Sequence, residues 1–293
     1  QYAVHIKPDS AVKQLGRDIK ALFTSPVLFI NALPAVVAMI IHNKAAIEMK
    51  ASIPAINPFS WDVLFAGLDR TVHFGVDPWR LLQPLLGYPA VTFMINNLYN
   101  FWFLLMFGMW FWFAFKSRHS EVRDRFFIAF TLTWFIGGGI MAVVFSSAGP
   151  VYYGNLGLSP NPFAELMAYL HGVNDNVIAL WALNTQQMLW DGYTGVEKNF
   201  LGISAFPSMH NAVVTVFVCA AWQVIRGFGK AVAVYAFFIL IGSVHLGWHY
   251  ALDSYVGIAL GLAGWWVAGF ISRWHARQPW VQDYQRSLES IAR

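Results

Sequence analysis

The chain has 293 residues, of which 57% are hydrophobic, 17% aromatic and only 12% charged; its mean hydropathy is +0.49. Soluble domains carry roughly 25% charged residues, so this composition excludes an ordinary soluble domain and predicts an integral membrane protein. The net charge of +4 does not indicate a nucleic-acid partner, because the positions of the basic residues along the chain matter more than their total. The single cysteine, Cys219, excludes an intrachain disulfide.

Six apolar stretches approach the roughly 20 residues that a membrane-spanning helix needs. We expect spans at 22–42, 91–115, 126–147, 208–225, 231–248 and 252–272. The first is the weakest, because Asn31 and Pro34 interrupt it. The predicted fold class is an all-α integral membrane protein with six transmembrane helices. Residues 1–293 would form a single membrane domain with a catalytic core at about 126–272.

The basic residues predict the orientation of these spans, since Lys and Arg near span ends stay on the cytoplasmic side. With a cytoplasmic N-terminus, only five of the 19 Lys and Arg residues fall in outer segments, which leaves 14 inside. The five are Lys44, Lys50, Arg70, Arg80 and Lys198. We therefore expect both termini in the cytoplasm, with 273–293 as a cytoplasmic tail, in a multi-pass protein of a bacterial inner membrane.

Two long outer segments, 43–90 and 148–207, contain apolar stretches that are too short to span a membrane. Ile56 to Phe74, Pro78 to Leu86 and Val177 to Trp190 have the length and composition of short interfacial helices. We expect these segments to form a cap over a site on the periplasmic face.

Three polar clusters fall on that outer face, at residues 146–154, 206–210 and 249–253. Placing a titratable side chain near hydrocarbon costs free energy, so such residues are interpreted first as parts of a functional site. His249 and Asp253 are spaced i and i+4 and can touch on one helix face. A carboxylate on one ring nitrogen of a histidine leaves the other nitrogen free as a nucleophile or base.

Ser208 and His210 begin another helix, where free backbone N–H groups favour an anion such as phosphate. His210 could protonate a leaving oxygen as a general acid. The structural alternatives are an ordinary N-cap for Ser208, a packing role for His210 and a simple capping turn for His249 and Asp253.

Residues 205–210, Ala-Phe-Pro-Ser-Met-His, resemble the Pro-Ser-Gly-His motif of the type 2 phosphatidic acid phosphatase superfamily, with Met209 in the glycine position. Residues 242–253 resemble its third motif, Ser-Arg-x5-His-x3-Asp, with Ser243 in the arginine position. The most similar branch contains the fungal inositol phosphorylceramide synthases and their bacterial relatives. The first motif of the superfamily, Lys-x6-Arg-Pro, has no evident match.

This resemblance implies that His249 is the nucleophile that forms a phosphohistidine and that Asp253 orients it. It also implies that His210 is the general acid, that Ser208 binds phosphate, and that no metal or other cofactor is needed. The missing motif and the missing arginine normally supply positive charge, which stabilises phosphoryl transfer. Candidate replacements are Lys198, Arg70, Arg80 and His245, with hydroxyls from Tyr152 and Tyr153. Lys198 and the two arginines could equally be solvated, and His245 could be only a neighbour of His249.

The function expected from the sequence is a membrane enzyme that transfers a phosphoryl group or phospho-headgroup at the outer leaflet. Its partners would be a lipid phosphate or phospholipid substrate, an alcohol or polyol acceptor, and membrane lipids, with no nucleic acid. A lipid phosphate phosphatase of the same superfamily is the alternative, because the motif residues do not decide whether water or an alcohol attacks the phosphohistidine. A metal site built from His210, His245, His249 and Asp253, in a hydrolase or a haem protein, lacks a known ligand pattern. A transporter should instead show repeated halves and polar residues at mid-bilayer.

Overall fold

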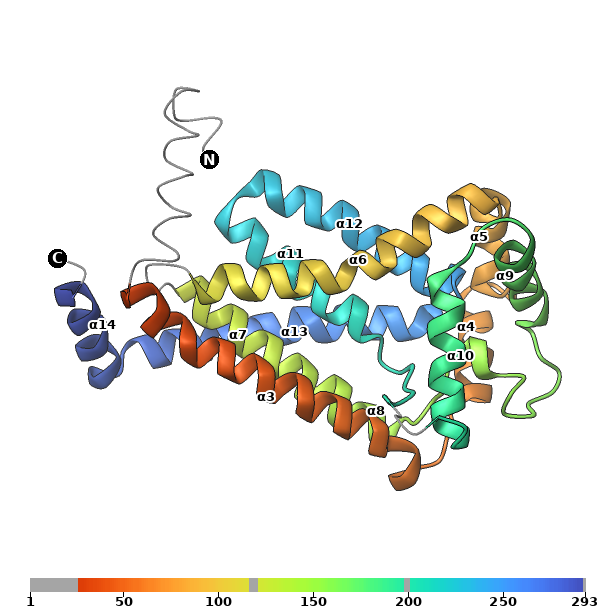
Figure 1. The fold of residues 1–293 in the computed structure, drawn as a ribbon, viewed down its shortest axis with the longest axis horizontal. Coiled ribbons are helices and arrows are strands. Elements are labelled where there is room, and N and C mark those ends of the chain that lie inside the picture. The colour runs from red at the N-terminus through yellow and green to blue at the C-terminus, as the bar shows by residue number, and fades with distance from the viewer. Residues whose placement is uncertain (1–25, 116–120, 198–200, 292–293) are drawn as a thin grey trace.

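The computed structural model describes residues 26–115, 121–197 and 201–291, and every regular element in these ranges is a helix (Figure 1). The long helices are α3 (Pro26–Ile56), α6 (Pro89–Ala114), α12 (Arg226–His245) and α13 (Ala251–Ala276). A further long segment runs through α7 (Glu121–Thr133), the π-helix η1 (Trp134–Met141) and α8 (Ala142–Val144).

Five of these segments are long and apolar enough to cross a membrane, which indicates a membrane protein. They correspond to five of the six expected spans. The expected span 208–225 forms α11 (Met209–Val224), which has 16 residues and is shorter than a typical span. A sixth membrane crossing therefore stays a prediction, as do the positions of the termini.

The first helix requires a correction. The described part of α3 continues to Ile56, so residues 43–56 belong to the helix and not to an outer cap segment. Ala, Glu, Met and Lys dominate this extension, and all are strong helix formers. Residues 22–25 of the expected span lie outside the described part of the chain.

Short helices gather at one end of the bundle (Figure 1). They are α4 (Asp62–Val72), α5 (Pro78–Leu86), α9 (Ala164–Asn176) and α10 (Trp181–Thr194). The bounds of α5 are those expected, α4 lies within the expected Ile56 to Phe74, and α10 overlaps Val177 to Trp190. The sequence did not predict α9, nor α14 (Pro279–Ile291) at the opposite end of the bundle.

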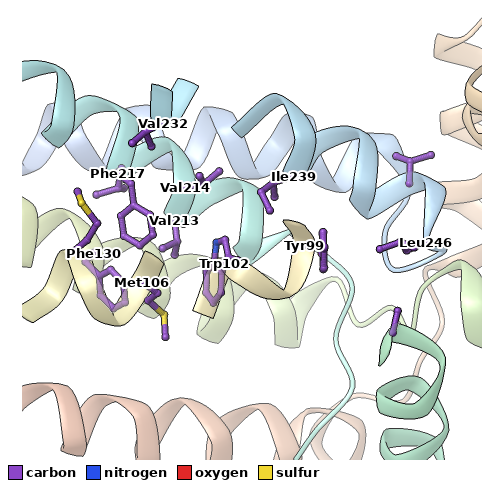
Figure 2. Close-up of a cluster of buried hydrophobic side chains, with 14 of the residues drawn as sticks. Tyr99, Trp102, Met106, Phe130, Val213, Val214, Phe217, Val232, Ile239 and Leu246 are labelled. Atoms are coloured by element: carbon purple, nitrogen blue, oxygen red, sulfur yellow. The ribbon is translucent and has the colours of Figure 1, made fainter. Parts of the chain in front are cut away.

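Helix α11 lies at the centre of the bundle, packed against α7, α12 and α13. Figure 2 shows Val213, Val214 and Phe217 of α11 facing side chains of α6, α7 and α12. Nine residues of α11 are buried, and they lie on all of its faces. A helix that is apolar all round is suited to such a position.

Glycines on α13 permit the closest helix contact near the polar motifs. A Cβ at Gly257 would overlap the carbonyl oxygen of Ser208, and one at Gly261 would overlap that of Ala212. Small residues four positions apart let helix backbones approach closely in membrane proteins. This contact fixes the first turn of α11 against the first turns of α13.

Candidate active site

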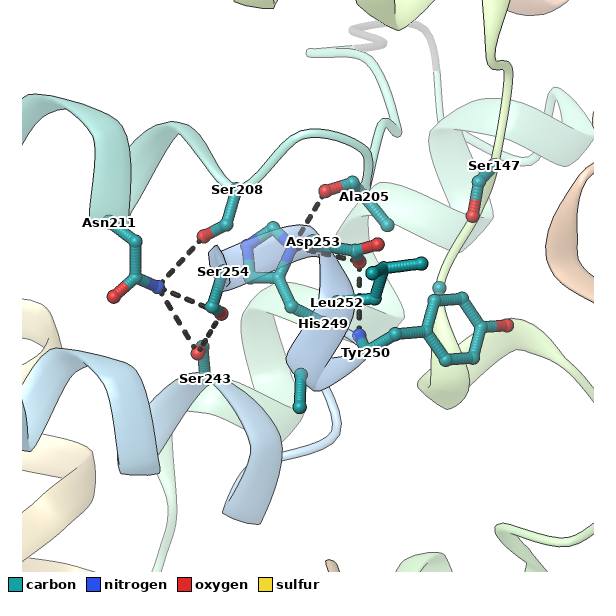
Figure 3. A network of polar contacts seen from close by, with 12 residues as sticks. Ser147, Ala205, Ser208, Asn211, Ser243, His249, Tyr250, Leu252, Asp253 and Ser254 are labelled. Atoms are coloured by element: carbon teal, nitrogen blue, oxygen red, sulfur yellow. Dashed lines mark hydrogen bonds and ion pairs between the residues drawn. The ribbon is translucent and has the colours of Figure 1, made fainter. Parts of the chain in front are cut away.

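His249 lies in the short turn between α12 and α13, and the residue is 7% exposed. Its Nδ1 is 2.7 Å from the carbonyl oxygen of Ala205. A carbonyl oxygen only accepts, so Nδ1 carries the hydrogen and donates it, which leaves the lone pair on Nε2. The same Nδ1 is 3.6 Å from Asp253 Oδ2 (Figure 3).

The expected orienting contact therefore differs in detail from the one observed. Ala205 makes the short hydrogen bond to the imidazole, whereas Asp253 stands at ion-pair distance. Asp253 Oδ2 accepts the backbone N–H of Tyr250 at 3.0 Å, and the Asp253 carbonyl accepts the N–H of Ser208 at 3.0 Å. Asp253 Oδ1 is buried and has no hydrogen-bond partner among the described residues. The backbone carbonyl of Asp253 thus joins the first turn of α13 to the segment that begins α11.

His210 is the second residue of α11, and the structure brings it to His249 with a ring-centroid separation of 6.3 Å. Its ring stacks on Tyr99 at 4.6 Å and lies against Trp102 at 4.4 Å. The indole N–H of Trp102 also donates to the carbonyl of His210 at 3.1 Å. Both aromatic residues come from α6, so this helix holds the second imidazole in place.

Ser208 belongs to a neutral polar cluster rather than acting as a side-chain cap for α11. The amide nitrogen of Asn211 lies 3.1 Å from Ser208 Oγ, 3.3 Å from Ser243 Oγ and 3.0 Å from Ser254 Oγ (Figure 3). Ser243 and Ser254 are 3.0 Å apart. A hydroxyl and amide cluster therefore occupies the place where the family pattern has an arginine.

Met209, which replaces the motif glycine, is accommodated by the π-helical segment η1. A Cβ at Gly137 would lie 2.9 Å from Met209 Sδ, and one at Gly138 would lie 3.8 Å from Met209 Cγ. The absence of side chains at these two glycines leaves space for the thioether. The side chain of Met209 therefore packs against η1 within the bundle, beside the site.

Lys50 is the functional candidate that sequence reasoning missed. It lies on the last two turns of α3, is half-buried, and interacts electrostatically with the imidazoles of both His210 and His249. The loop before α11 rests on it, because a Cβ at Gly202, whose φ is +86°, would collide with the backbone of Lys50. Lys50 has no ion pair with a described residue. It is the one described cation that interacts with both imidazoles.

A sequence signal for Lys50 exists. Lys50-x6-Asn57-Pro58 fits the first motif, Lys-x6-Arg-Pro, with asparagine in place of arginine. The amide of Asn57 does not replace the arginine, since its Nδ2 donates to the carbonyl of Val143 at 2.8 Å and so caps the end of α8.

The other proposed cations are engaged elsewhere or lie outside the described residues. Arg70 makes two hydrogen bonds to Asp77, at 3.1 and 2.8 Å. Arg80 bonds Glu165 at 2.7 Å and lies 3.6 Å from Asp77. These contacts join α4, α5 and α9 in the cap. Lys198 falls outside the part of the chain that the structure describes.

The remaining candidates have structural partners. Tyr152 donates to the carbonyl of Gln186 at 2.9 Å, and burial raises the pKa of its phenol. Tyr153 packs against Phe163 with ring centroids 5.5 Å apart. His245 Nε2 lies 2.9 Å from Thr92 Oγ1. The first two contacts lie within the cap, and the third joins α6 to α12.

Asp62 organises the segment that follows the third expected span. Its buried carboxylate accepts hydrogen bonds from the hydroxyls of Ser147 and Tyr250 and from the N–H groups of Ala148 and Gly149. Local sequence does not indicate a role for Asp62, because its partners lie 85 to 188 positions away. Tyr250 directly follows His249, so its hydrogen bond to Asp62 also fixes the turn that carries His249.

Asp69 has a related role at the start of α13. It accepts the N–H groups of Ala251 and Leu252, both at 2.9 Å. A carboxylate here satisfies free helix N–H groups and complements the helix dipole. Within the described ranges, no three or more His, Cys, Asp or Glu side chains converge in a way that could hold a metal ion.

Together these features define a helical membrane protein with two imidazoles, a lysine and a serine at one end of its bundle. The sequence model of the PAP2 superfamily matches residues 64–267, and the chain belongs to that superfamily. Membership suggests a phosphatase or phosphotransferase. No curated protein and no solved structure matches the chain, so similarity to one particular branch stays a prediction. Lys50 precedes the matched range.

Proposed function

We propose that the protein transfers the phospho-headgroup of a phospholipid to an alcohol acceptor at the outer leaflet, through a phosphohistidine at His249. The observation that carries this proposal is the geometry of the two imidazoles. Ala205 holds the Nδ1 hydrogen of His249, so Nε2 keeps its lone pair, and His210 lies 6.3 Å away between centroids.

The protonation state of His249 suits a nucleophile. Burial lowers the pKa of His249 to about 3; the hydrogen bond to Ala205 opposes this shift and the nearby Lys50 ammonium adds to it. The imidazole is therefore neutral throughout the physiological pH range. A neutral ring needs no prior deprotonation before it attacks phosphorus.

Each step balances with the residues present. Nε2 of His249 attacks phosphorus, a P–N bond forms, and the P–O bond to the leaving alcohol breaks. His210, which takes up a proton when the anionic substrate binds, gives that proton to the leaving oxygen. The hydroxyl of the acceptor then attacks phosphorus, the P–N bond breaks, and the hydroxyl proton returns to His210. The Asp253 carboxylate, 3.6 Å from Nδ1, stabilises the positive charge on the phosphorylated ring.

The charge of the site favours a phosphodiester substrate. A phosphate monoester carries about −1.5 to −2 charges at pH 7, whereas a diester carries a single one. Lys50 is the one described cation at the histidines, and both arginine positions of the family pattern are neutral, as Asn57 and Ser243. One lysine matches the monoanionic phosphate of a phospholipid. This observation supports headgroup transfer over hydrolysis of a lipid phosphate.

The nucleophile is tested with His249→Ala in purified protein, assayed with phospholipids and alcohol acceptors. Turnover should fall at least about a thousandfold, as expected for loss of a nucleophile. His275→Asn is the matched control, because this histidine lies at the opposite end of α13. A His249→Ala variant with turnover like that of the control would overturn the proposal.

The products distinguish transfer from hydrolysis. A phospholipid supplied with an alcohol should yield a lipid or polyol that carries the transferred group, detected by mass. Release of inorganic phosphate from a lipid phosphate, with no transfer product from any phospholipid, would instead establish the phosphatase.

A further inference from the structure

A small cavity of about 180 Å³ lies in the cap, between the segment 151–161, α9 and α10. We call it the cap cavity. Four amide side chains line it, those of Asn155, Asn161, Gln186 and Gln187, together with the ring of Trp190. Trp190 stacks on Tyr152 with centroids 5.4 Å apart and an angle of 19°, so this wall is preformed.

The cap cavity is polar and has no permanently charged side chain. Its lining contains no Lys, Arg, Asp or Glu, and His171 is its one imidazole, so amides and not charges dominate its polar surface. Amide side chains both donate and accept hydrogen bonds, and an indole offers an apolar face. Hydroxyl groups on a carbon skeleton are the complement of that combination.

Gln186 provides an independent observation. The side chain is 2% exposed, and its Nε2 donates to the carbonyl of Leu246 at 2.9 Å. Its Oε1 is buried and accepts no hydrogen bond from any described residue. A buried acceptor without a partner is destabilising. A hydroxyl donor from a ligand in the cavity would satisfy it.

The cap cavity is connected to the catalytic turn through two hydrogen bonds. Gln186 bonds the carbonyl of Leu246, and the N–H of Val151 donates to the carbonyl of Gly247 at 3.0 Å. These carbonyls precede His249 by three and two residues. A ligand seated against this wall therefore lies next to the peptide segment that positions the nucleophile.

The volume limits the size of the ligand. A water molecule occupies about 30 Å³ of liquid, so the cavity has room for about six waters. Drug-sized ligands need about 300–1,000 Å³. One polyol or one sugar ring matches the smaller volume.

We propose that the cap cavity binds the polyhydroxylated, uncharged headgroup of the acceptor, either as a free polyol or as the sugar of a glycolipid. The proposal rests on the proposed transfer function. One acceptor hydroxyl attacks the phosphorus on His249, the P–N bond breaks, and the hydroxyl proton passes to His210. The remaining hydroxyls bond the amides of the cavity.

The test uses two matched substitutions on α10. Gln187→Leu removes an exposed amide that lines the cavity, and Asn184→Leu removes an exposed amide of the same helix that does not. Asn155→Trp fills the cavity from an exposed loop position and needs no change in the buried wall. The full-length protein in detergent or vesicles is used throughout.

Binding is measured by saturation-transfer NMR with myo-inositol, and transfer by the KM for the same polyol. A second arm uses vesicles with monoglucosyl diacylglycerol as the lipid-borne source. We expect Gln187→Leu to raise the acceptor KM about fivefold to tenfold, as for loss of one hydrogen bond, and Asn155→Trp to raise it further. Asn184→Leu should match the wild type. The source with the lower KM identifies the natural form of the acceptor.

The two proposals fail differently. Suppose that the wild-type protein transfers headgroups. The acceptor site is then refuted if Gln187→Leu and Asn155→Trp leave the acceptor KM unchanged, or if they alter only the KM of the phospholipid donor. If myo-inositol shows no saturation transfer and neither source accepts the group while the wild type forms phosphohistidine, it is also refuted. If the wild type never forms phosphohistidine from any phospholipid, the transfer function itself fails.

Discussion

Replacement of Lys50 tests how this site neutralises phosphate. The ammonium of Lys50 lies near both imidazoles and has no ion pair with a described residue. Its charge is therefore available to a substrate phosphate. We predict that Lys50→Gln lowers kcat/KM strongly while the protein stays folded, because no internal salt bridge is lost.

The magnitude follows from the burial of this lysine. Two unit charges about 4 Å apart interact by about 4 kcal/mol at an effective dielectric constant of 20. Lys50 is half-buried, so solvent screens part of this energy, and charge-assisted hydrogen bonds are worth about 1.5–3 kcal/mol. A loss of about 2–3 kcal/mol corresponds to a fall in kcat/KM of about 30-fold to 150-fold.

The assay compares Lys50→Gln, Lys50→Arg and Lys44→Gln for headgroup release from a phospholipid. Lys44 is an exposed lysine on the same helix, and its replacement should leave kcat/KM within about twofold. Lys50→Arg keeps the charge and should recover part of the loss. If Lys50→Gln stays within threefold of the wild type in an assay where His249→Ala is inactive, Lys50 does not neutralise the phosphate.

Three further predictions concern stability. Gly257→Ala should destabilise the protein by about 1–3 kcal/mol, because the added Cβ meets the backbone of Ser208. In the control, Gly108→Ala on α6, the added Cβ has nothing within 4 Å and should be neutral or slightly stabilising in thermal unfolding. Equal melting temperatures of the two variants would contradict close packing at Gly257. Asp62→Asn should lower the unfolding free energy by about 2–4 kcal/mol through the loss of charge-assisted hydrogen bonds, and an unchanged melting temperature would show that these bonds contribute little. Because the pKa of His249 is depressed in the folded protein, the unfolded chain binds an extra proton below about pH 6.5. The wild-type protein should therefore lose stability relative to His249→Gln as the pH falls from about 6.5 towards 3. Parallel curves of unfolding free energy against pH for the two proteins would refute a neutral buried imidazole.

Much of the helical architecture could be predicted because hydropathy alone marks apolar segments of spanning length. The bounds of helix ends were less predictable. Asn43 and Lys44 resemble the end of a span, yet good helix formers carry α3 on to Ile56. Helix α9 was missed because its polar residues obscure a short buried face formed by Leu166, Leu170 and Val173.

The site was predictable where a local pattern carries the chemistry and not where it depends on distant contacts. Spacing indicated His210 and His249, and the structure brings their rings together. Lys50 was not predicted because the first motif is recognised by its arginine, and Asn57 occupies that position here. Asp62 could not be found from local sequence, since its role depends on partners at least 85 positions away.

Trapping the phosphorylated imidazole shows directly whether Nε2 of His249 is the nucleophile. Purified protein is mixed briefly with phospholipid in the absence of an acceptor, quenched at alkaline pH, digested and analysed by mass spectrometry. We expect an acid-labile phosphoryl or phospho-headgroup adduct on residue 249, absent from His249→Ala and present in His275→Asn. An active wild type with no adduct at His249, or with its adduct on another residue, would exclude His249 as the nucleophile.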